Sequence, residues 1–117
     1  MNKTQQSLID SIGKTPMVKL HELSDIYNTN VYAKLEGFNP GHSAKDRTVL
    51  NMIEQAEKEG KLEKGVSTLI EATSGNTGFS LAMICAIKGY KCVVCVKDKS
   101  SIEKIIYIIE HTHSTVF

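Results

Sequence analysis

The chain has 117 residues, of which 41% are hydrophobic and 23% charged, and its formal net charge is +1. A chain of this length forms at most one domain, and its hydrophobic content is typical of a folded core. The nearly neutral charge argues against a nucleic-acid partner, and no apolar run approaches the ~18 residues of a membrane span. The N-terminus lacks the apolar core of a signal peptide, so we expect a cytoplasmic protein without membrane contact.

The three cysteines are predicted to be reduced thiols in the core, because their number is odd and their neighbours are apolar. Cys92 and Cys95 have the C-x-x-C spacing, but they lie in an apolar run that is typical of a buried strand. Positions three apart on a strand point to opposite faces, so we expect no redox or metal site there. The four histidines show no metal-ligand grouping either.

Residues 1–38 are predicted to form an N-terminal arm with a short helix and a first strand. The expected elements are an amphipathic helix over 4–12, an extended segment over 15–20, a polar connector over 21–30 and a strand over 31–36. Thr4 is the expected helix cap and Gly13 the expected helix end. The proline at position 16 keeps the residue before it out of the helical region.

Residues 39–117 alternate helices and strands. The expected elements are a helix over 44–59, a strand over 68–72, a helix over 76–88, a strand over 91–97, a helix opened by Ser100 and a strand fragment over 115–117. Val49, Met52, Ile53 and Ala56 follow the spacing of one apolar helix face. The alternation predicts an α/β fold, a parallel sheet with right-handed crossovers and helices on both faces.

Residues 39–47, with the sequence NPGHSAKDR, place Lys45 in the first turn of a helix, directly after an Asn-Pro-Gly turn. The partial positive charge of a helix start disfavours an ammonium group, and a dry site would further favour the neutral amine, a nucleophile for carbonyl groups. The alternative is an ordinary surface lysine. Arg47 opposes the helix dipole, so it either has a specific partner or is exposed.

Residues 73–78, with the sequence TSGNTG, join an apolar strand to a long apolar helix. A strand, a glycine-containing loop and a helix start form an arrangement that binds anions, and the hydroxyls of Thr73, Ser74 and Thr77 add donors. The alternative is a helix capped by Ser74 or Asn76 after a tight turn. The glycine spacing matches neither a Walker loop nor a dinucleotide fingerprint.

Three blocks, residues 12–18, 39–47 and 71–78, resemble in this order the cysteine synthase (O-acetylserine sulfhydrylase) family of pyridoxal-phosphate enzymes, which includes cystathionine β-synthase. The resemblance extends from about Ser7 to about Val96 and weakens after that. It implies the N-terminal domain of a fold-type II pyridoxal-phosphate enzyme, with the tryptophan synthase β-like fold.

The resemblance also implies roles for individual residues. Lys45 would be the Schiff-base lysine for pyridoxal phosphate, and Asn76 would bond the ring hydroxyl of the cofactor. The α-carboxylate of a small amino-acid substrate would be held by Thr73, Ser74, Thr77 and the backbone of Gly75. The implied reaction is β-replacement on an O-activated serine, with Lys45 as the base for the Cα proton and sulfide, a thiol or an amine as the nucleophile.

The family holds the cofactor phosphate on a glycine-rich loop far downstream, in a part that this chain is expected to lack. We therefore expect a truncated N-terminal part, weakly active or inactive, without the C-terminal cofactor-phosphate domain. The alternatives are a non-catalytic binding module or pseudoenzyme that keeps the carboxylate-binding loop, and an unrelated α/β domain. Because the family's N-terminal arm often packs on a second subunit, the expected partners include a second copy of this chain or another family member.

Overall fold

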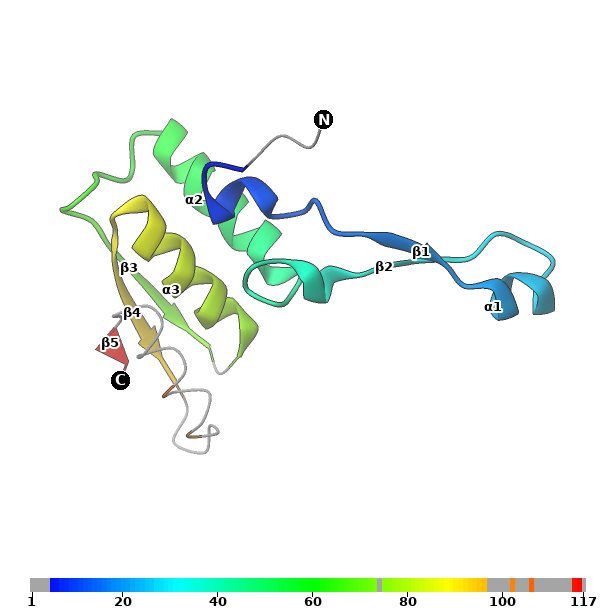
Figure 1. Ribbon diagram of the computed structural model, residues 1–117. Coiled ribbons are helices and arrows are strands. Elements are labelled where there is room, and N and C mark those ends of the chain that lie inside the picture. Colours follow the sequence, from blue (N-terminus) through cyan, green and yellow to red (C-terminus); the bar gives the residue numbers. More distant parts are fainter. Residues whose placement is uncertain (1–4, 74, 97–101, 103–105, 107–114, 117) are drawn as a thin grey trace.

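The computed structural model describes residues 5–73, 75–96, 102, 106 and 115–116 (Figure 1). The elements in chain order are the 3-10 helix η1 (Leu8–Ser11), β1 (Met17–Lys19), α1 (His21–Ile26), β2 (Tyr32–Lys34), the 3-10 helix η2 (Glu36–Phe38), α2 (Lys45–Lys58), β3 (Thr68–Ala72), α3 (Asn76–Lys88), β4 (Lys91–Cys95) and β5 (Thr115–Val116). Within the described ranges, every helix is too short or too polar to cross a membrane.

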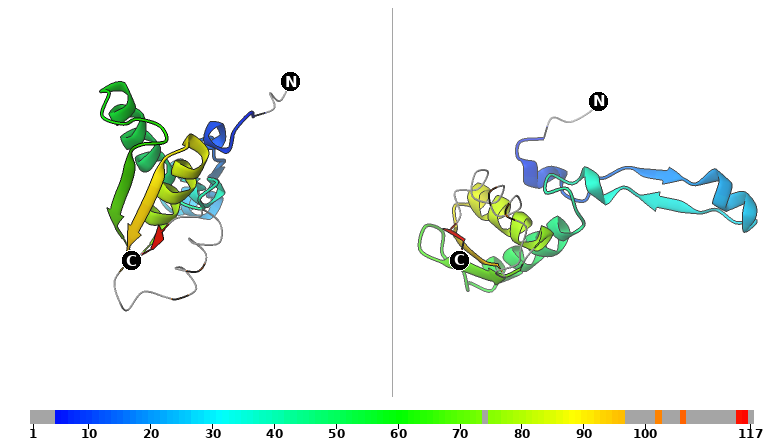
Figure 2. Two further views of the ribbon diagram at one scale, coloured as in Figure 1. Left: turned by 90° about the vertical axis from the view of Figure 1, so that its left-hand side faces the viewer. Right: turned by 90° about the horizontal axis from the view of Figure 1, so that it is seen from below.

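The N-terminal arm is an antiparallel hairpin that projects away from the rest of the molecule (Figures 1 and 2). β1 pairs with β2 so that Met17 lies opposite Lys34 and Lys19 opposite Tyr32. The strand expected over 31–36 therefore belongs to a separate two-stranded antiparallel sheet and not to the parallel sheet.

Two details of the arm differ from the sequence prediction. The polar connector over 21–30 contains the helix α1, which is only six residues long and has no side-chain cap, so its local pattern is weak. The first helix is shorter than predicted, and its cap is Ser7 instead of Thr4. The Ser7 hydroxyl accepts from the amide of Ile9 at 3.3 Å, and the Asp10 carboxylate accepts from the amide of Ser7 at 3.0 Å.

The parallel sheet is confirmed and has the strand order β3-β4-β5. Leu69 lies opposite Cys92 and Glu71 opposite Val94, so these four side chains share one face. The chain leaves β3, forms α3 and returns as β4, which is the predicted crossover. Of the helix predicted to begin at Ser100, the structure describes only residues 102 and 106, both of them helical, and His111 and His113 lie outside the described residues.

The core lies where α3 meets β4 on one side and α2 on the other. Its fully buried side chains include Ile53, Ile84, Val94 and Cys85. Ile53 and Val49 confirm the predicted apolar face of α2. Met52 is 60% exposed, yet it lines one apolar pocket together with these two residues.

Candidate active site

Lys45 is the first residue of α2 and is held at the end of a tight turn. The amide of His42 donates to the carbonyl of Asn39 at 2.8 Å, and the amide of Lys45 donates to Ser43 Oγ at 3.2 Å. His42 has a φ of 59°, a left-handed conformation that a non-glycine residue rarely adopts. The Lys45 side chain is exposed, so the dry environment considered from the sequence is not present among the described residues.

The loop between β3 and α3 leaves the start of α3 without a side-chain cap. The N-cap residue is Gly75, and among the described residues no side chain caps the helix, so the alternative in which Asn76 is the cap is wrong. Asn76 is instead the exposed first residue of α3, and Thr77 is half-buried. The predicted carboxylate ligand Ser74 lies outside the described residues. Uncapped helix amides are the groups that bind anions.

There is room for a ligand at this loop. A Cβ built on Gly75 would meet no atom within 4 Å. The Thr73 hydroxyl accepts from the amide of Gly75 at 3.3 Å, which fixes the approach of the chain to the helix. An exposed amine, an exposed amide, threonine hydroxyls and free helix amides are the polar groups that a phosphorylated aldehyde cofactor and an amino-acid carboxylate require. The described residues therefore fit pyridoxal phosphate chemically.

The packing of α2 on α3 brings Lys45 and this loop to the same end of the molecule. Near the start of both helices, Ser80 Oγ donates to Asp46 Oδ1 at 2.5 Å. Near their ends, Lys88 Nζ donates to Glu57 Oε2 at 2.7 Å. Both links therefore require the two helices to run in the same direction, as Figure 1 shows. Their first residues, Lys45 and Asn76, consequently lie at the same end, where β3 also has its carboxyl end.

Arg47 has a specific partner, Glu36, which is one of the two possibilities that the sequence left open for this arginine. Its guanidinium donates to both carboxylate oxygens of Glu36 at 2.9 Å and to the carbonyl of Gly13 at 2.8 Å. Asn39 joins the same cluster, because its side-chain oxygen accepts from the Gly13 amide at 2.8 Å and its side-chain NH₂ donates to Glu36 Oε2 at 2.8 Å. The hydrogen bond from Arg47, more than any other contact, lowers the pKa of Glu36 to about 2. No sequence pattern pointed to Glu36. The clue was the position of Arg47 at a helix start, where a positive charge is unfavourable unless it has a partner.

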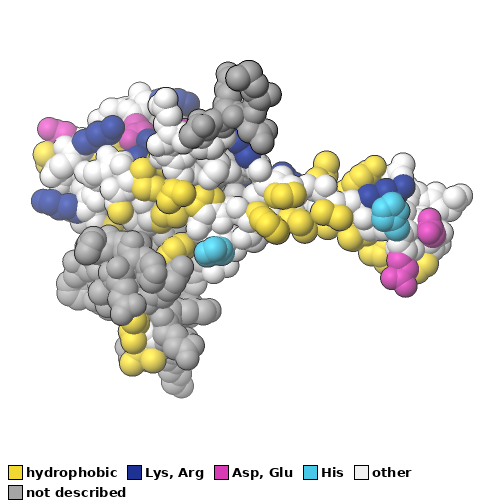
Figure 3. All heavy atoms as spheres, in the orientation of Figure 1, with side chains coloured by type: hydrophobic (Ala, Val, Ile, Leu, Met, Phe, Trp, Pro, Cys, Tyr) yellow, Lys and Arg dark blue, Asp and Glu magenta, His cyan; other side chains and the backbone are white. Residues whose placement is uncertain are grey.

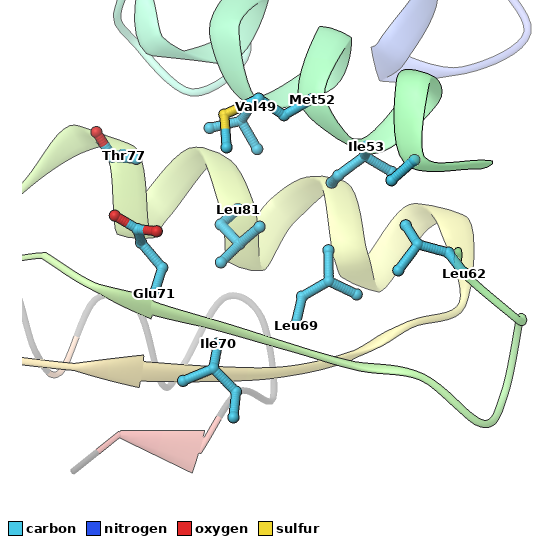
Figure 4. A pocket seen from close by; sticks show the side chains of 10 residues that line it. Val49, Met52, Ile53, Leu62, Leu69, Ile70, Glu71, Thr77 and Leu81 are labelled. Carbon is cyan, nitrogen blue, oxygen red and sulfur yellow. The ribbon is translucent and has the colours of Figure 1, made fainter. Parts of the chain in front are cut away.

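A mostly apolar pocket of about 260 Å³ lies beside this end of the helices, between α2, β3 and α3 (Figure 4). Thr77 and Glu71 stand together at one end of it, and apolar side chains, among them Leu69 and Leu81, line the rest (Figure 4). Lys45 is not among the residues that line it. We place the polar chemistry at the helix starts and not in this pocket, because an apolar lining does not bind a charged substrate.

The three cysteines form no disulfide. Cys85 and Cys92 are buried, as predicted, whereas Cys95 is only partly buried. Cys95 ends β4 beside the loop that precedes α3, where its carbonyl accepts from the amide of Thr73 at 2.9 Å. The pKa of the Cys85 thiol is raised mainly by a hydrogen bond with Cys92 and to a smaller extent by burial. In the part of the chain that the structure describes, no three His, Cys, Asp or Glu side chains are grouped as metal ligands.

Comparisons with known proteins show the family of the chain. The family model described as "Pyridoxal-phosphate dependent enzyme" matches residues 8–117. A cysteine synthase of Staphylococcus aureus is 49% identical over 102 residues, which cover 87% of this chain and 33% of that protein. A cystathionine beta-synthase of Apis mellifera is 46% identical over 105 residues, which cover 88% of this chain and 21% of that protein.

A solved structure shows the same fold. The crystal structure of a hydrogen sulfide-producing enzyme from Fusobacterium nucleatum has a TM-score of 0.88 and 48% sequence identity, over 100% of this chain and 38% of that one. This likeness confirms the predicted α/β architecture. The chain thus spans between about a fifth and two fifths of the length of these three proteins.

Proposed function

Because the chain belongs to the pyridoxal-phosphate dependent enzyme family, we propose that it supplies the lysine and the carboxylate-binding loop of a cysteine synthase-like enzyme. The proposed reaction is β-replacement on an O-activated serine, and it is carried by one observation. The parallel packing of α2 on α3 brings Lys45 and the loop before Asn76 to the same end.

In this proposal the residues have separate tasks. When bound, pyridoxal phosphate supplies an electron sink for negative charge at the substrate Cα. The Lys45 amine holds the cofactor aldehyde and, once free, takes the Cα proton as a general base. Asn76 donates to the ring hydroxyl of the cofactor. The substrate carboxylate is held by Thr73, Ser74, Thr77 and the backbone of Gly75.

Fixing the substrate carboxylate matters because it orients the Cα–H bond that breaks when Lys45 takes the proton. A carboxylate held at the start of α3 would limit the positions that the substrate Cα can take relative to Lys45 at the start of α2. The names of the relatives, a cysteine synthase and a cystathionine beta-synthase, support a sulfur nucleophile, either sulfide or a thiol. We propose no residue of this chain for the cofactor phosphate.

The hairpin arm supports a proposal about association. Its exposed apolar side chains include Met17, Ile26, Tyr27 and Tyr32, each more than half exposed. Figure 3 shows hydrophobic atoms gathered along this arm. Patches of this kind on a projecting element are typical of protein interfaces. We propose that the arm packs on a second subunit, either another copy of the chain or another family member.

The exposure of Lys45 and Asn76 favours a second candidate function. Water reaches both side chains, so neither lies in the water-excluded site that favours this chemistry. The second candidate is a binding module that keeps the carboxylate loop without catalysing the reaction. Product formation from O-acetylserine and sulfide in the presence of pyridoxal phosphate separates the two, since only the enzyme gives cysteine.

Reductive labelling tests the role of Lys45. The chain is incubated with pyridoxal phosphate, reduced with borohydride and digested, and the modified lysines are located by mass spectrometry. We expect preferential labelling of Lys45 that Lys45→Ala abolishes. Lys58→Ala is the matched control, because Lys58 is an exposed lysine at the other end of the same helix. Labelling spread evenly over the lysines, and unchanged in Lys45→Ala, would refute the proposed function.

A further inference from the structure

Asp46 is a fully buried carboxylate beside the proposed cofactor lysine, and the mechanism above gives it no task. Its Oδ2 accepts from the amide of Gly41 at 2.5 Å, and its Oδ1 accepts from the Ser80 hydroxyl at 2.5 Å. Both of these donors are neutral. A buried carboxylate satisfied in this way is costly compared with an apolar side chain of similar size, so core packing alone does not explain it.

The two donors lie on the two sides of the proposed site. Gly41 belongs to the turn that precedes Lys45, and Ser80 follows Asn76 by four residues, about 6 Å along the helix axis. Asp46 itself is the residue after Lys45. Its carboxylate therefore ties the lysine turn directly to the start of α3.

The turn is fitted closely to this carboxylate. A Cβ built on Gly41 would lie 2.1 Å from Asp46 Oδ1 and 2.8 Å from its Cγ. The backbone of the turn therefore rests on Asp46 without space between them. Apolar contacts between α2 and α3 tolerate small sliding motions, whereas two directed hydrogen bonds on one carboxylate fix the position of the turn.

We propose that Asp46 is a positioning residue that holds the turn of Lys45 in register with the start of α3. The proposal rests on the proposed function, since it concerns the placement of Lys45 relative to Asn76. Small displacements of a reacting group lower reaction rates strongly. Loosening the link through Asp46 should therefore reduce the reaction of Lys45 while leaving the fold intact.

The test compares two buried serines. Ser80→Ala removes the donor on α3 and leaves Asp46 Oδ1 without this hydrogen bond. Ser24→Ala is the matched control, because both serines are buried, with 5% and 0% exposure. The Ser24 hydroxyl also makes two hydrogen bonds, which are partly buried and lie in the distant arm: it donates to the carbonyl of Leu20 and accepts from the amide of Val31. Ser80→Thr keeps the hydroxyl and should rescue the loss. Each variant is measured by reductive labelling with pyridoxal phosphate and by amide hydrogen exchange in NMR.

We expect Ser80→Ala to raise the exchange rate of the Gly41 amide and to lower labelling of Lys45, each by roughly tenfold. Ser24→Ala should change neither quantity, and Ser80→Thr should restore both. Unchanged exchange at Gly41 in Ser80→Ala would overturn the proposal, and so would an equal loss of labelling in Ser24→Ala. A failure of the proposed function is distinguishable from these results, because Lys45 would then show no preference in the unmodified chain.

Discussion

Replacing Gly41 by alanine should destabilise the chain strongly, whereas Gly37→Ala should be close to neutral. Neither glycine has a positive φ, so backbone strain does not distinguish them. The difference lies in the space around the new methyl group. At Gly41 the methyl carbon would lie 2.1 Å from Asp46 Oδ1, whereas at Gly37 it would meet nothing within 4 Å.

The magnitude follows from the bonds that must break. The methyl group forces the Asp46 carboxylate out of place, and both of its hydrogen bonds, to Gly41 and to Ser80, are then lost or weakened. Hydrogen bonds to charged groups contribute about 1.5–3 kcal/mol each. We therefore expect Gly41→Ala to lower the free energy of unfolding by about 3–5 kcal/mol. Gly37→Ala should stabilise by up to about 1 kcal/mol, because alanine restricts the unfolded chain.

Urea unfolding followed by circular dichroism measures this difference. A slope of about 1–3 kcal/mol per molar urea converts a loss of 3 kcal/mol into a midpoint shift of about 1–3 M. Such a loss is a large part of the free energy of unfolding of a typical domain, which is ~5–15 kcal/mol. Equal midpoints for Gly41→Ala and Gly37→Ala would refute the close contact between the turn and the buried carboxylate.

Two further predictions concern titrating groups. The hydrogen bond from Arg47 lowers the pKa of Glu36 from 4.5 to about 2, so Glu36 stabilises the fold above pH 4.5 and this contribution is lost as the pH falls towards 2. Glu36→Gln should therefore weaken the pH dependence of the urea midpoint in that window, and Glu22→Gln, at an exposed glutamate, should leave it unchanged. A disulfide reagent should modify the partly buried Cys95 before Cys85, whose pKa is raised by a hydrogen bond with a second buried thiol and by burial; equal rates in the native chain would contradict this order.

The sequence predicted best the elements that bury a continuous apolar face. The strand over 68–72 and the helix over 76–88 have the predicted bounds, and α2 begins and ends within one residue of its prediction. The helix α2 has a clear apolar periodicity, α3 is apolar on nearly all sides, and Gly89 ends α3 in a left-handed conformation. The helix α1 escaped prediction because six residues carry too little periodic pattern.

The polar links around Lys45 could not be predicted, because their partners are distant in the sequence. Asp46 and Ser80 are 34 positions apart, and so are Arg47 and Gly13. From the sequence, Asp46 suited the dipole at a helix start, and the same local pattern fits an exposed side chain. Only the packing of α2 on α3 buries this carboxylate and gives it a partner.

The block at residues 12–18 carries no group with a proposed chemical task, yet the structure connects it to the site. Its Gly13 has a φ of +80°, and a Cβ there would lie 2.7 Å from Nη1 of Arg47. The residue must be small because the guanidinium occupies that space, held by the Gly13 carbonyl and by Glu36. Arg47 in turn lies two residues after Lys45. The blocks at 12–18 and 39–47 are therefore one hydrogen-bonded unit. Residues 12–18 hold the start of α2 from one side, and Ser80 of α3, two positions after the third block, holds it from the other.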